Sequence, residues 1–136
     1  MASSITIRGL SKHYGAFAAL SDISIDIPAG QFVTLLGPSG SGKTTLLMSI
    51  AGFAHPDRGS IRIDDQEILG LEPDKRDIGV VFQNYALFPH MSVEENVAYP
   101  LKLRRVPAAE RAARVKHALQ AVQMEGFGAR RIHELS

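Results

Sequence analysis

A glycine-rich segment in the first half of the chain constrains its fold more than any other feature. Residues 37–44 read GPSGSGKT and fit the pattern G-x-x-x-x-G-K-[ST] at every fixed position. The nearly continuous apolar run Gln31–Leu36 comes before it and predicts a strand covered on both faces. A helix is predicted from about Lys43 to Ala51, with Gly52 near its end. A strand, a glycine-rich loop and a helix in this order are typical of a phosphate-binding loop.

The residue types of this loop explain the chemistry that it predicts. Glycines let the backbone curve around phosphate oxygens with its N–H groups pointing inward, and the N-terminus of the next helix adds partial positive charge. Lys43 is expected to reach the β- and γ-phosphates, and Thr44 to place its hydroxyl on Mg²⁺, with Thr45 assisting nearby. A nucleoside triphosphate with Mg²⁺ is therefore expected at Gly37, Pro38, Ser39, Gly40, Ser41, Gly42, Lys43, Thr44 and Thr45.

Hydrophobic periodicity predicts a β-rich first part and a helical second part. Isoleucines alternate with polar residues in 5–8 and 23–27, which predicts half-buried, antiparallel strands. The same alternation in 60–64 predicts a short exposed strand, and 78–82 reads as a second buried strand. A capping box, Ser92 with Glu95, is expected to open a helix that ends near Leu103. A second helix is expected after Pro107, with one apolar stripe formed by Ala108, Ala112, Val115, Leu119 and Val122.

Composition narrows the class of protein. With 45% hydrophobic and 21% charged residues the chain reads as an ordinary globular domain. The net charge of +1 gives no electrostatic case for a nucleic-acid partner. The chain has no cysteine, so disulfides, thiolate zinc sites and cysteine nucleophiles are excluded. Neither a signal peptide nor a stretch of roughly 20 apolar residues is found, and a cytosolic chain is expected.

Three further segments flank the phosphate loop in a fixed order. Tyr14 lies upstream in SKHYG, Gln83 lies downstream in GVVFQNYALFPHMSVEENVAYPL, and the last four residues read HELS. With these segments the chain resembles the nucleotide-binding subunit of ATP-binding cassette (ABC) transporters over essentially all of its 136 residues. The stretch from Gln83 to Leu101 is most similar to bacterial importers of the polyamine, ferric iron, sulfate and sugar type. The glycine-rich loop is widespread, whereas its combination with the glutamine segment is highly specific.

The resemblance implies roles for residues outside the loop. Tyr14 matches an aromatic residue that stacks on adenine, although packing within the β layer is the alternative interpretation. Gln83 matches a glutamine that approaches Mg²⁺ and the attacking water, which an amide can do through its carbonyl and its NH₂ group; a polar strand end is the alternative. Leu135 and Ser136 match the start of the signature LSGGQ, which implies that Ser136 contacts the γ-phosphate bound by the opposite subunit.

The resemblance also implies partners. The region after the glutamine, residues 84–97, is expected to meet a coupling helix of a membrane permease, and the exposed apolar residues expected there are Tyr85, Leu87, Phe88 and Met91. The alternative is that these four fill the core of the helical part. A homodimer of ATP-binding subunits and an indirect link to a periplasmic or extracellular binding protein follow from the family. The expected location is peripheral, on the cytoplasmic face of the inner membrane.

The implied architecture is α/β, a P-loop NTPase core with an antiparallel β subdomain and an α-helical subdomain. We expect 1–136 to be a partial nucleotide-binding domain, with 1–88 as the β-rich part that carries the phosphate loop and Gln83, and 89–136 as the helical subdomain. The sequence stops inside the signature, and we expect it to be a truncated product or a fragment. The sheet should then be incomplete and leave the apolar face of Gln31–Leu36 uncovered.

The catalytic residues implied are Lys43 and Gln83, and the implied Mg²⁺ ligands are Thr44 and Gln83. No apolar strand ending in Asp-Glu follows the signature, and the nearest string, Ile61–Asp65, precedes Gln83. ATP binding with little hydrolysis is therefore expected of this chain alone. Two alternatives stay open: a soluble ABC ATPase in translation or DNA repair, and a non-catalytic fragment that docks on a permease. A third, a P-loop kinase, has no support, because no residues resemble a phosphoacceptor site.

Overall fold

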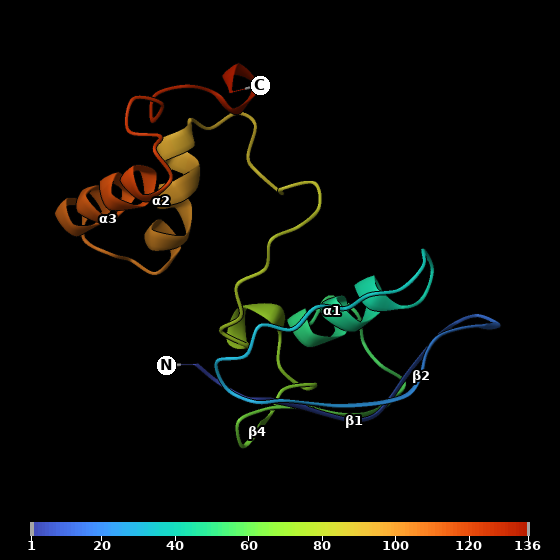
Figure 1. Ribbon diagram of the computed structural model, residues 1–136. Coiled ribbons are helices and arrows are strands. Elements are labelled where there is room, and N and C mark those ends of the chain that lie inside the picture. The colour runs from blue at the N-terminus through green and yellow to red at the C-terminus, as the bar shows by residue number, and fades with distance from the viewer. Residues whose placement is uncertain (1, 136) are drawn as a thin grey trace. The chain divides into compact units, whose positions relative to one another are not determined.

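The computed structural model describes residues 2–135 of the chain. It divides into two compact units, Met1–Val80 and Val81–Ser136. Figure 1 colours the chain from blue at the N-terminus to red at the C-terminus.

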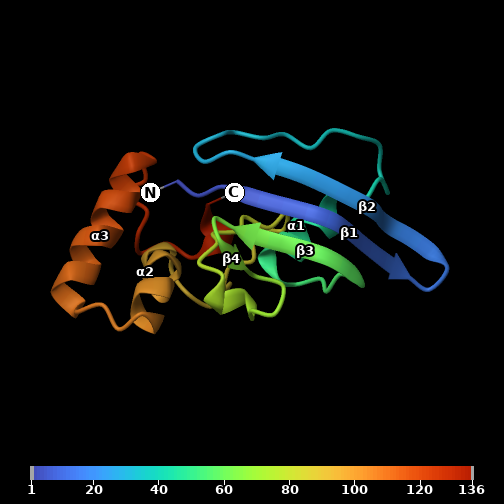
Figure 2. The same cartoon turned by 90° about the horizontal axis from the view of Figure 1, so that it is seen from below.

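The first unit is built on a four-stranded antiparallel sheet in the order β2-β1-β3-β4 (Figure 2). Strand β1 (Ile5–Tyr14) pairs with β2 (Phe17–Ile27) on one side and with β3 (Arg58–Ile63) on the other. The short strand β4 (Gln66–Glu67) pairs with the free edge of β3. Ile7 lies opposite both Ile25 and Ile61 in this register. The isoleucine alternation thus predicted β1 and β2 correctly as antiparallel strands. It also predicted the strand at β3, but the expectation that this strand is exposed is wrong, because Ile61 is fully buried between its neighbours.

Helix α1 (Lys43–Ala51) covers one face of this sheet, and the predicted helix bounds are confirmed (Figure 1). Leu46 of α1 packs into a buried cluster with sheet residues that include Ile7 and Ile61. Gly52 ends the helix with φ 94°, a left-handed conformation that glycine adopts without a Cβ penalty, and its N–H donates to the Met48 carbonyl. A short 3₁₀ turn, η1 (Pro73–Lys75), follows later in the unit.

Arg76 joins the end of α1 to the segment that follows β4. Its guanidinium is almost fully buried and donates to the carbonyls of Ser49 and Ile50 at 2.8 and 2.9 Å. It also donates to the carbonyls of Leu71 and Leu69 at 2.9 and 3.3 Å. Burial lowers the pKa of Arg76 from its ordinary value, although a guanidinium stays charged at neutral pH. The cation thereby satisfies carbonyls at the C-terminus of α1.

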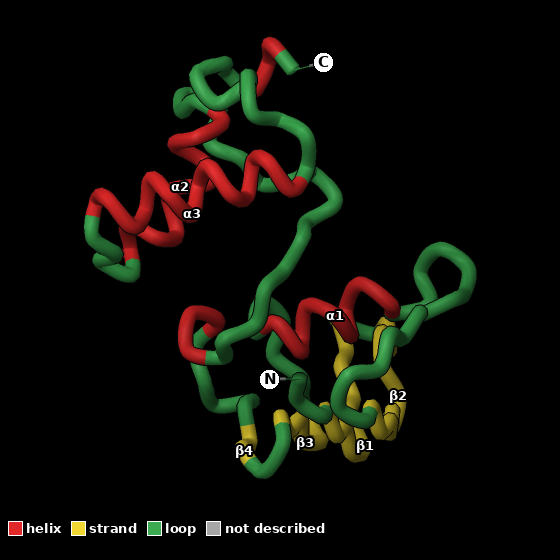
Figure 3. Tube along the Cα trace, turned by 60° about the vertical axis from the view of Figure 1, so that its left-hand side comes forward, coloured by secondary structure: helices red, strands yellow, loops and turns green. Residues whose placement is uncertain are grey.

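The two predicted buried strands are wrong. Residues 31–39 and 78–82 form no strand, and Figure 3 draws the segment between β2 and α1 as loop. A strand of this kind needs hydrogen-bonded neighbours and covered faces. Among the described residues no strand pairs with either segment, and Phe32, Leu36 and Val81 are 95%, 88% and 92% exposed. The expectation that the apolar side chains of Gln31–Leu36 lie uncovered is confirmed for Phe32 and Leu36, whereas Leu35 is partly buried against the cluster of the sheet.

The second unit is helical. Helix α2 (Val93–Leu103) and helix α3 (Ala108–Ala121) pack together, and a 3₁₀ turn, η2 (Ile132–Glu134), follows. Their shared core consists of Val93, Ala98, Val115 and Leu119. The predicted stripe on α3 is therefore right only at Val115 and Leu119. Ala108 and Ala112 are exposed, and Val122 lies beyond the helix and is 62% exposed.

The start of α2 shows the predicted capping box. The Ser92 hydroxyl accepts from the backbone N–H of Glu95 at 3.2 Å, and the Glu95 carboxylate accepts from the Ser92 N–H at 2.8 Å. The backbone hydrogen bond from Ser92 is the main reason that the pKa of Glu95 lies below its usual value. The segment before η2 lies against this helix start, since Val93 N–H donates to the Arg130 carbonyl at 2.9 Å.

Candidate functional site

The predicted phosphate loop and Tyr14 border one cavity in the first unit. The cavity has a volume of about 390 Å³. It is lined by Tyr14, Phe17, Ala19, Ser39, Gly40, Ser41, Gly42, Lys43, Thr44 and Thr45. Aromatic side chains from the β1–β2 hairpin therefore meet the loop and the first residues of α1 in one hollow. Of the residues predicted to contact a nucleotide, Gly37 and Pro38 do not line it.

Gly42 fixes how closely the loop approaches the sheet. It precedes α1 with φ 86°, in the left-handed region. A Cβ at this position would lie 2.3 Å from the Ala19 carbonyl oxygen on β2, far inside van der Waals contact. Only glycine can adopt this conformation and leave room for the Ala19 carbonyl. The motif therefore needs glycine at position 42 for packing against β2 as well as for phosphate binding.

Lys43 folds back over the loop. Its ammonium nitrogen donates to the carbonyls of Gly37 and Pro38 at 2.8 and 2.6 Å and to the Ser41 hydroxyl at 3.0 Å. An ammonium group has three donors, so these three oxygens satisfy it. An anion that enters the cavity must take the place of one of them, and the Ser41 hydroxyl is the partner that can rotate away.

The N-terminus of α1 is suited to an anion. Within the described residues no side chain caps this helix and no acidic residue occupies its first turn. The first backbone N–H groups of a helix have no partner inside the helix, and they carry partial positive charge. Together with Lys43 they form a local concentration of donors and positive charge at one end of the cavity.

Thr44 and Thr45 supply hydroxyl groups at this end of the cavity. Both line it, and Thr45 also accepts through its carbonyl a hydrogen bond from the Ser49 hydroxyl at 2.8 Å. Oxygen donors are what Mg²⁺ prefers, and it is commonly held by one or two protein groups with the phosphates of the nucleotide. The hydroxyl of Thr44, a residue that lines the same cavity as Lys43, therefore fits the donor set of a magnesium nucleotide.

Tyr14 and Phe17 form the other end of the cavity. They face each other as partners in the β1–β2 register, at the tip of the hairpin. The two residues are 54% and 58% exposed, so neither is packed into the β layer. Sequence reasoning missed Phe17; the available signal was a second aromatic residue three positions after Tyr14, with Gly15 between them.

The remaining predicted site residues lie elsewhere. Gln83 belongs to the second unit, where it occupies a turn and is exposed. Its placement beside the nucleotide stays a prediction. Leu135 follows η2 and is 39% exposed. Ser136 lies outside the described residues, so its contact with a second nucleotide also stays a prediction.

The predicted docking segment, residues 84–97, presents apolar side chains on the second unit. Tyr85 is 74% exposed, Leu87 47% and Phe88 37%, and none of them belongs to the buried cluster around Val93. Asn96 holds the segment in shape, because its side chain accepts from the Phe88 N–H at 2.9 Å and donates to the Phe88 carbonyl at 3.1 Å. Apolar side chains on a shaped loop are typical of an interaction surface.

Comparison with known proteins identifies the family. A protein-family model described as "ABC transporter" matches residues 20–136. The chain is 52% identical over 132 residues to the spermidine/putrescine import ATP-binding protein PotA of Nitrosomonas eutropha, covering 97% of the chain and 36% of that protein. It is 47% identical over 133 residues to the sulfate/thiosulfate import ATP-binding protein CysA of Synechocystis, covering 98% of the chain and 38% of that protein. The chain thus spans a little over a third of the length of these relatives.

A solved structure shares the fold. The chain matches the dimeric, post-hydrolysis ATP-binding cassette MJ0796 bound to ADP and Pi, with a TM-score of 0.85 and 31% identity over 97% of this chain and 63% of that one. Among the described residues, no helix combines the length and apolar character needed to cross a membrane. The glycine-rich loop before α1, the sheet of the same unit and these matches lead to one conclusion: the chain has an α/β fold and belongs to the ABC transporter family.

Proposed function

We propose that the chain binds ATP as part of the ATP-binding subunit of an ABC import system. The observation that carries this proposal is the single cavity that joins two aromatic residues to the phosphate loop. In this arrangement the triphosphate lies at the N-terminus of α1 and the base lies toward Tyr14. The printed names of the relatives, which are import ATP-binding proteins, support an importer over a soluble ABC ATPase of translation or DNA repair.

Different groups of the site would contact the phosphates, the Mg²⁺ and the adenine of the nucleotide. The backbone N–H groups before and within the first turn of α1 would hold phosphate oxygens, and the ammonium of Lys43 would exchange the Ser41 hydroxyl for a phosphate oxygen. Thr44 would contribute its hydroxyl to Mg²⁺, which neutralises charge on the phosphates when it is bound. Tyr14 would receive the adenine on its ring.

Hydrolysis and transport belong in this proposal to the complete subunit. Gln83 would there approach the Mg²⁺ and the attacking water, and Ser136 would contact the nucleotide of a second subunit. The parts proposed are 1–88, which carries the phosphate loop and Gln83, and 89–136, which forms the helical subdomain. The division of the chain into a sheet-based and a helical unit supports two parts of this kind, although that division falls between Val80 and Val81 and so places Gln83 in the helical unit.

The partner proposed for residues 84–97 is a membrane permease. The exposed side chains of Tyr85, Leu87 and Phe88 support this proposal, because they offer apolar area on a loop that Asn96 holds in shape. A permease contact would place the subunit at the cytoplasmic face of the membrane as a peripheral protein. Two such subunits would act together, and an extracytoplasmic binding protein would take part only through the permease.

The test is a titration of fluorescent ATP into the protein and into its Lys43→Ala variant. Loss of the ammonium removes a charged contact with the phosphates, so affinity should fall roughly ten- to a hundredfold. Lys75→Ala serves as the control, because Lys75 lies in the same unit with its side chain 69% exposed and paired with Asp74. Equal affinity in the Lys43→Ala variant and the control would refute the role of Lys43.

A further inference from the structure

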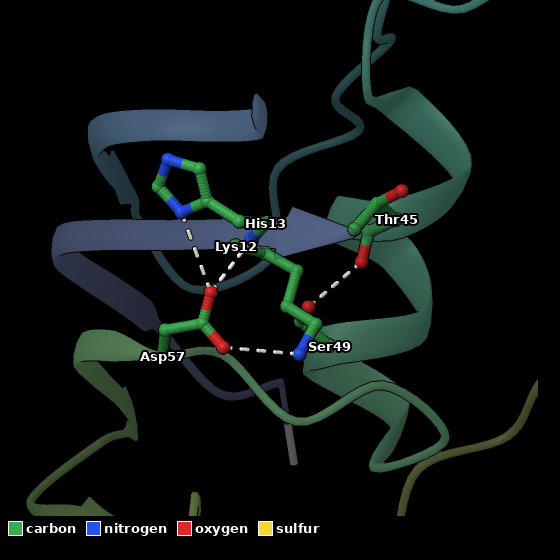
Figure 4. Close-up of polar contacts among 5 residues, drawn as sticks. All are labelled: Lys12, His13, Thr45, Ser49 and Asp57. Carbon is green, nitrogen blue, oxygen red and sulfur yellow. Dashed lines mark hydrogen bonds and ion pairs between the residues drawn. The ribbon is translucent and has the colours of Figure 1, made fainter. Parts of the chain in front are cut away.

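A carboxylate anchors the end of β1 directly beside Tyr14. Asp57 precedes β3, and its side chain accepts from the backbone N–H of His13 at 2.6 Å and from the Lys12 ammonium at 3.1 Å (Figure 4). The His13 ring nitrogen Nδ1 lies 3.4 Å from the same carboxylate. The N–H of Asp57 donates in turn to the Ser11 carbonyl at 2.8 Å. Asp57 is thus fixed to three successive residues of the strand that ends at Tyr14.

The ammonium of Lys12 lies between Asp57 and the ring of Tyr14. It is 5.3 Å from the centre of the ring, within the range of a cation–π contact. The Lys12 side chain is only 17% exposed, against 43% for Asp57, so the ammonium lies in a partly desolvated place. Tyr14 lines the cavity, whereas Lys12 is not among its lining residues.

The carboxyl group of Asp57 is negatively charged at neutral pH. The hydrogen bond from the His13 N–H, followed by the one from Lys12, keeps the pKa of Asp57 below its usual value. Lys12 therefore has a negatively charged partner at neutral pH, 3.1 Å from its ammonium nitrogen. Without that partner a lysine stem has several rotatable bonds and much rotamer freedom to lose.

We propose that Lys12, held by Asp57, is a positioning residue that fixes the ring of Tyr14 for the nucleotide base. Tyr14 is 54% exposed and lies at a hairpin tip, where an aromatic side chain without a support would sample several orientations. A cation over one face of the ring restricts it before the base arrives, so that less freedom is lost on binding. This inference rests on the proposed function, and it adds two residues to the ATP site that do not touch the cavity.

The test compares two ligands on the full chain: ATP, which has a base, and inorganic tripolyphosphate, which has none. Lys12→Met keeps the aliphatic stem and removes the charge, and it should weaken ATP binding about two- to fivefold while leaving tripolyphosphate binding unchanged. Lys12→Arg should restore ATP binding, because a guanidinium can make both contacts. Asp57→Asn should reproduce the effect of Lys12→Met, because it removes the negative charge that pairs with Lys12. Its amide oxygen can still accept from the His13 N–H, so the anchor on β1 is kept.

Arg8→Met is the matched control. Arg8 lies on the same strand and pairs with Asp26 at 2.6 Å, but it does not line the cavity. It should leave the affinity for both ligands unchanged, and thermal unfolding of every variant checks that the fold is kept.

The outcomes separate this inference from the proposed function. A Lys12→Met variant that binds both ligands as the wild type does, or that weakens both equally, overturns the positioning role, because charge attraction alone would then explain the result. Tyr14→Ala reports on the base site itself. If this variant keeps the wild-type preference for ATP over tripolyphosphate, the proposed stacking of the base fails, and the role of Lys12 is overturned with it.

Discussion

Gly42 offers the sharpest quantitative test of the phosphate loop. A Cβ at this position would lie 2.3 Å from the Ala19 carbonyl oxygen, whereas a carbon–oxygen contact needs about 3.3 Å. In Gly42→Ala the loop must therefore move by roughly 1 Å relative to β2. The residue also has φ 86°, and the left-handed conformation costs an L-residue with a side chain about 1–2 kcal/mol.

Two effects are expected in the Gly42→Ala variant. The free energy of unfolding, measured by urea denaturation, should fall by more than about 2 kcal/mol, because the clash adds to the cost of the conformation. ATP affinity, measured by titration calorimetry, should fall at least tenfold, since N–H groups displaced by roughly 1 Å lose charged hydrogen bonds of about 1.5–3 kcal/mol each.

Gly15→Ala provides the control for the conformational part alone. Gly15 also has a positive φ, of 59°, but a Cβ there would meet nothing within 4 Å. This variant should lose only about 1–2 kcal/mol of stability and keep its ATP affinity. If both variants lost the same stability and both kept their ATP affinity, the close approach of the loop to β2 would be refuted.

Three further predictions concern other parts of the chain. Amide hydrogen exchange over Gln31–Leu36 should be fast, because no strand pairs with this segment among the described residues; strong protection there would contradict the exposed loop. Arg76→Met should lower the free energy of unfolding by about 3 kcal/mol in urea, since it leaves buried carbonyls at the end of α1 without a donor, and an unchanged midpoint would refute that. Glu95 has a lowered pKa in the folded chain, so its contribution is present above its unfolded pKa and is lost as pH falls through the folded pKa. The stability difference between the wild type and Glu95→Gln should therefore shrink below about pH 4, and a difference that does not change with pH would contradict this.

Local signals in the sequence predicted the elements whose stability is local. Helix α1 follows directly from the loop motif and Gly52, and the helix start at Ser92 follows from its capping box. The β1–β2–β3 pairing follows from isoleucine alternation, because a half-buried antiparallel strand places every second side chain in the core.

The two failures have a common physical cause. Gln31–Leu36 and Ile78–Phe82 were predicted as strands because they are apolar, but an apolar run becomes a strand only with partners on its edges. No partner lies beside them among the described residues, and Phe32 and Val81 are exposed instead. Periodicity within a segment cannot report what lies next to it in space.

The sequence predicted the loop residues of the site but not Phe17 or Lys12, because the places of these two depend on contacts between segments. The motif fixes the spacing of the loop, so its residues could be named from the sequence. Phe17 could not, since its place in the cavity depends on the register in which it faces Tyr14 across the hairpin. Likewise, the contact of Lys12 with Asp57 joins residues 45 positions apart, which no local pattern reveals.

The most direct test of the central claim is to photolabel the protein with an azido-adenine analogue of ATP and to map the label by peptide sequencing. The claim is that the base of ATP lies in the cavity beside Tyr14 and Phe17 while its phosphates lie at α1. The account predicts that the label lies on the hairpin formed by β1 and β2, that excess ATP abolishes it, and that the Lys43→Ala substitution strongly reduces it. A label confined to α2 and α3, or one that excess ATP does not displace, would contradict the account.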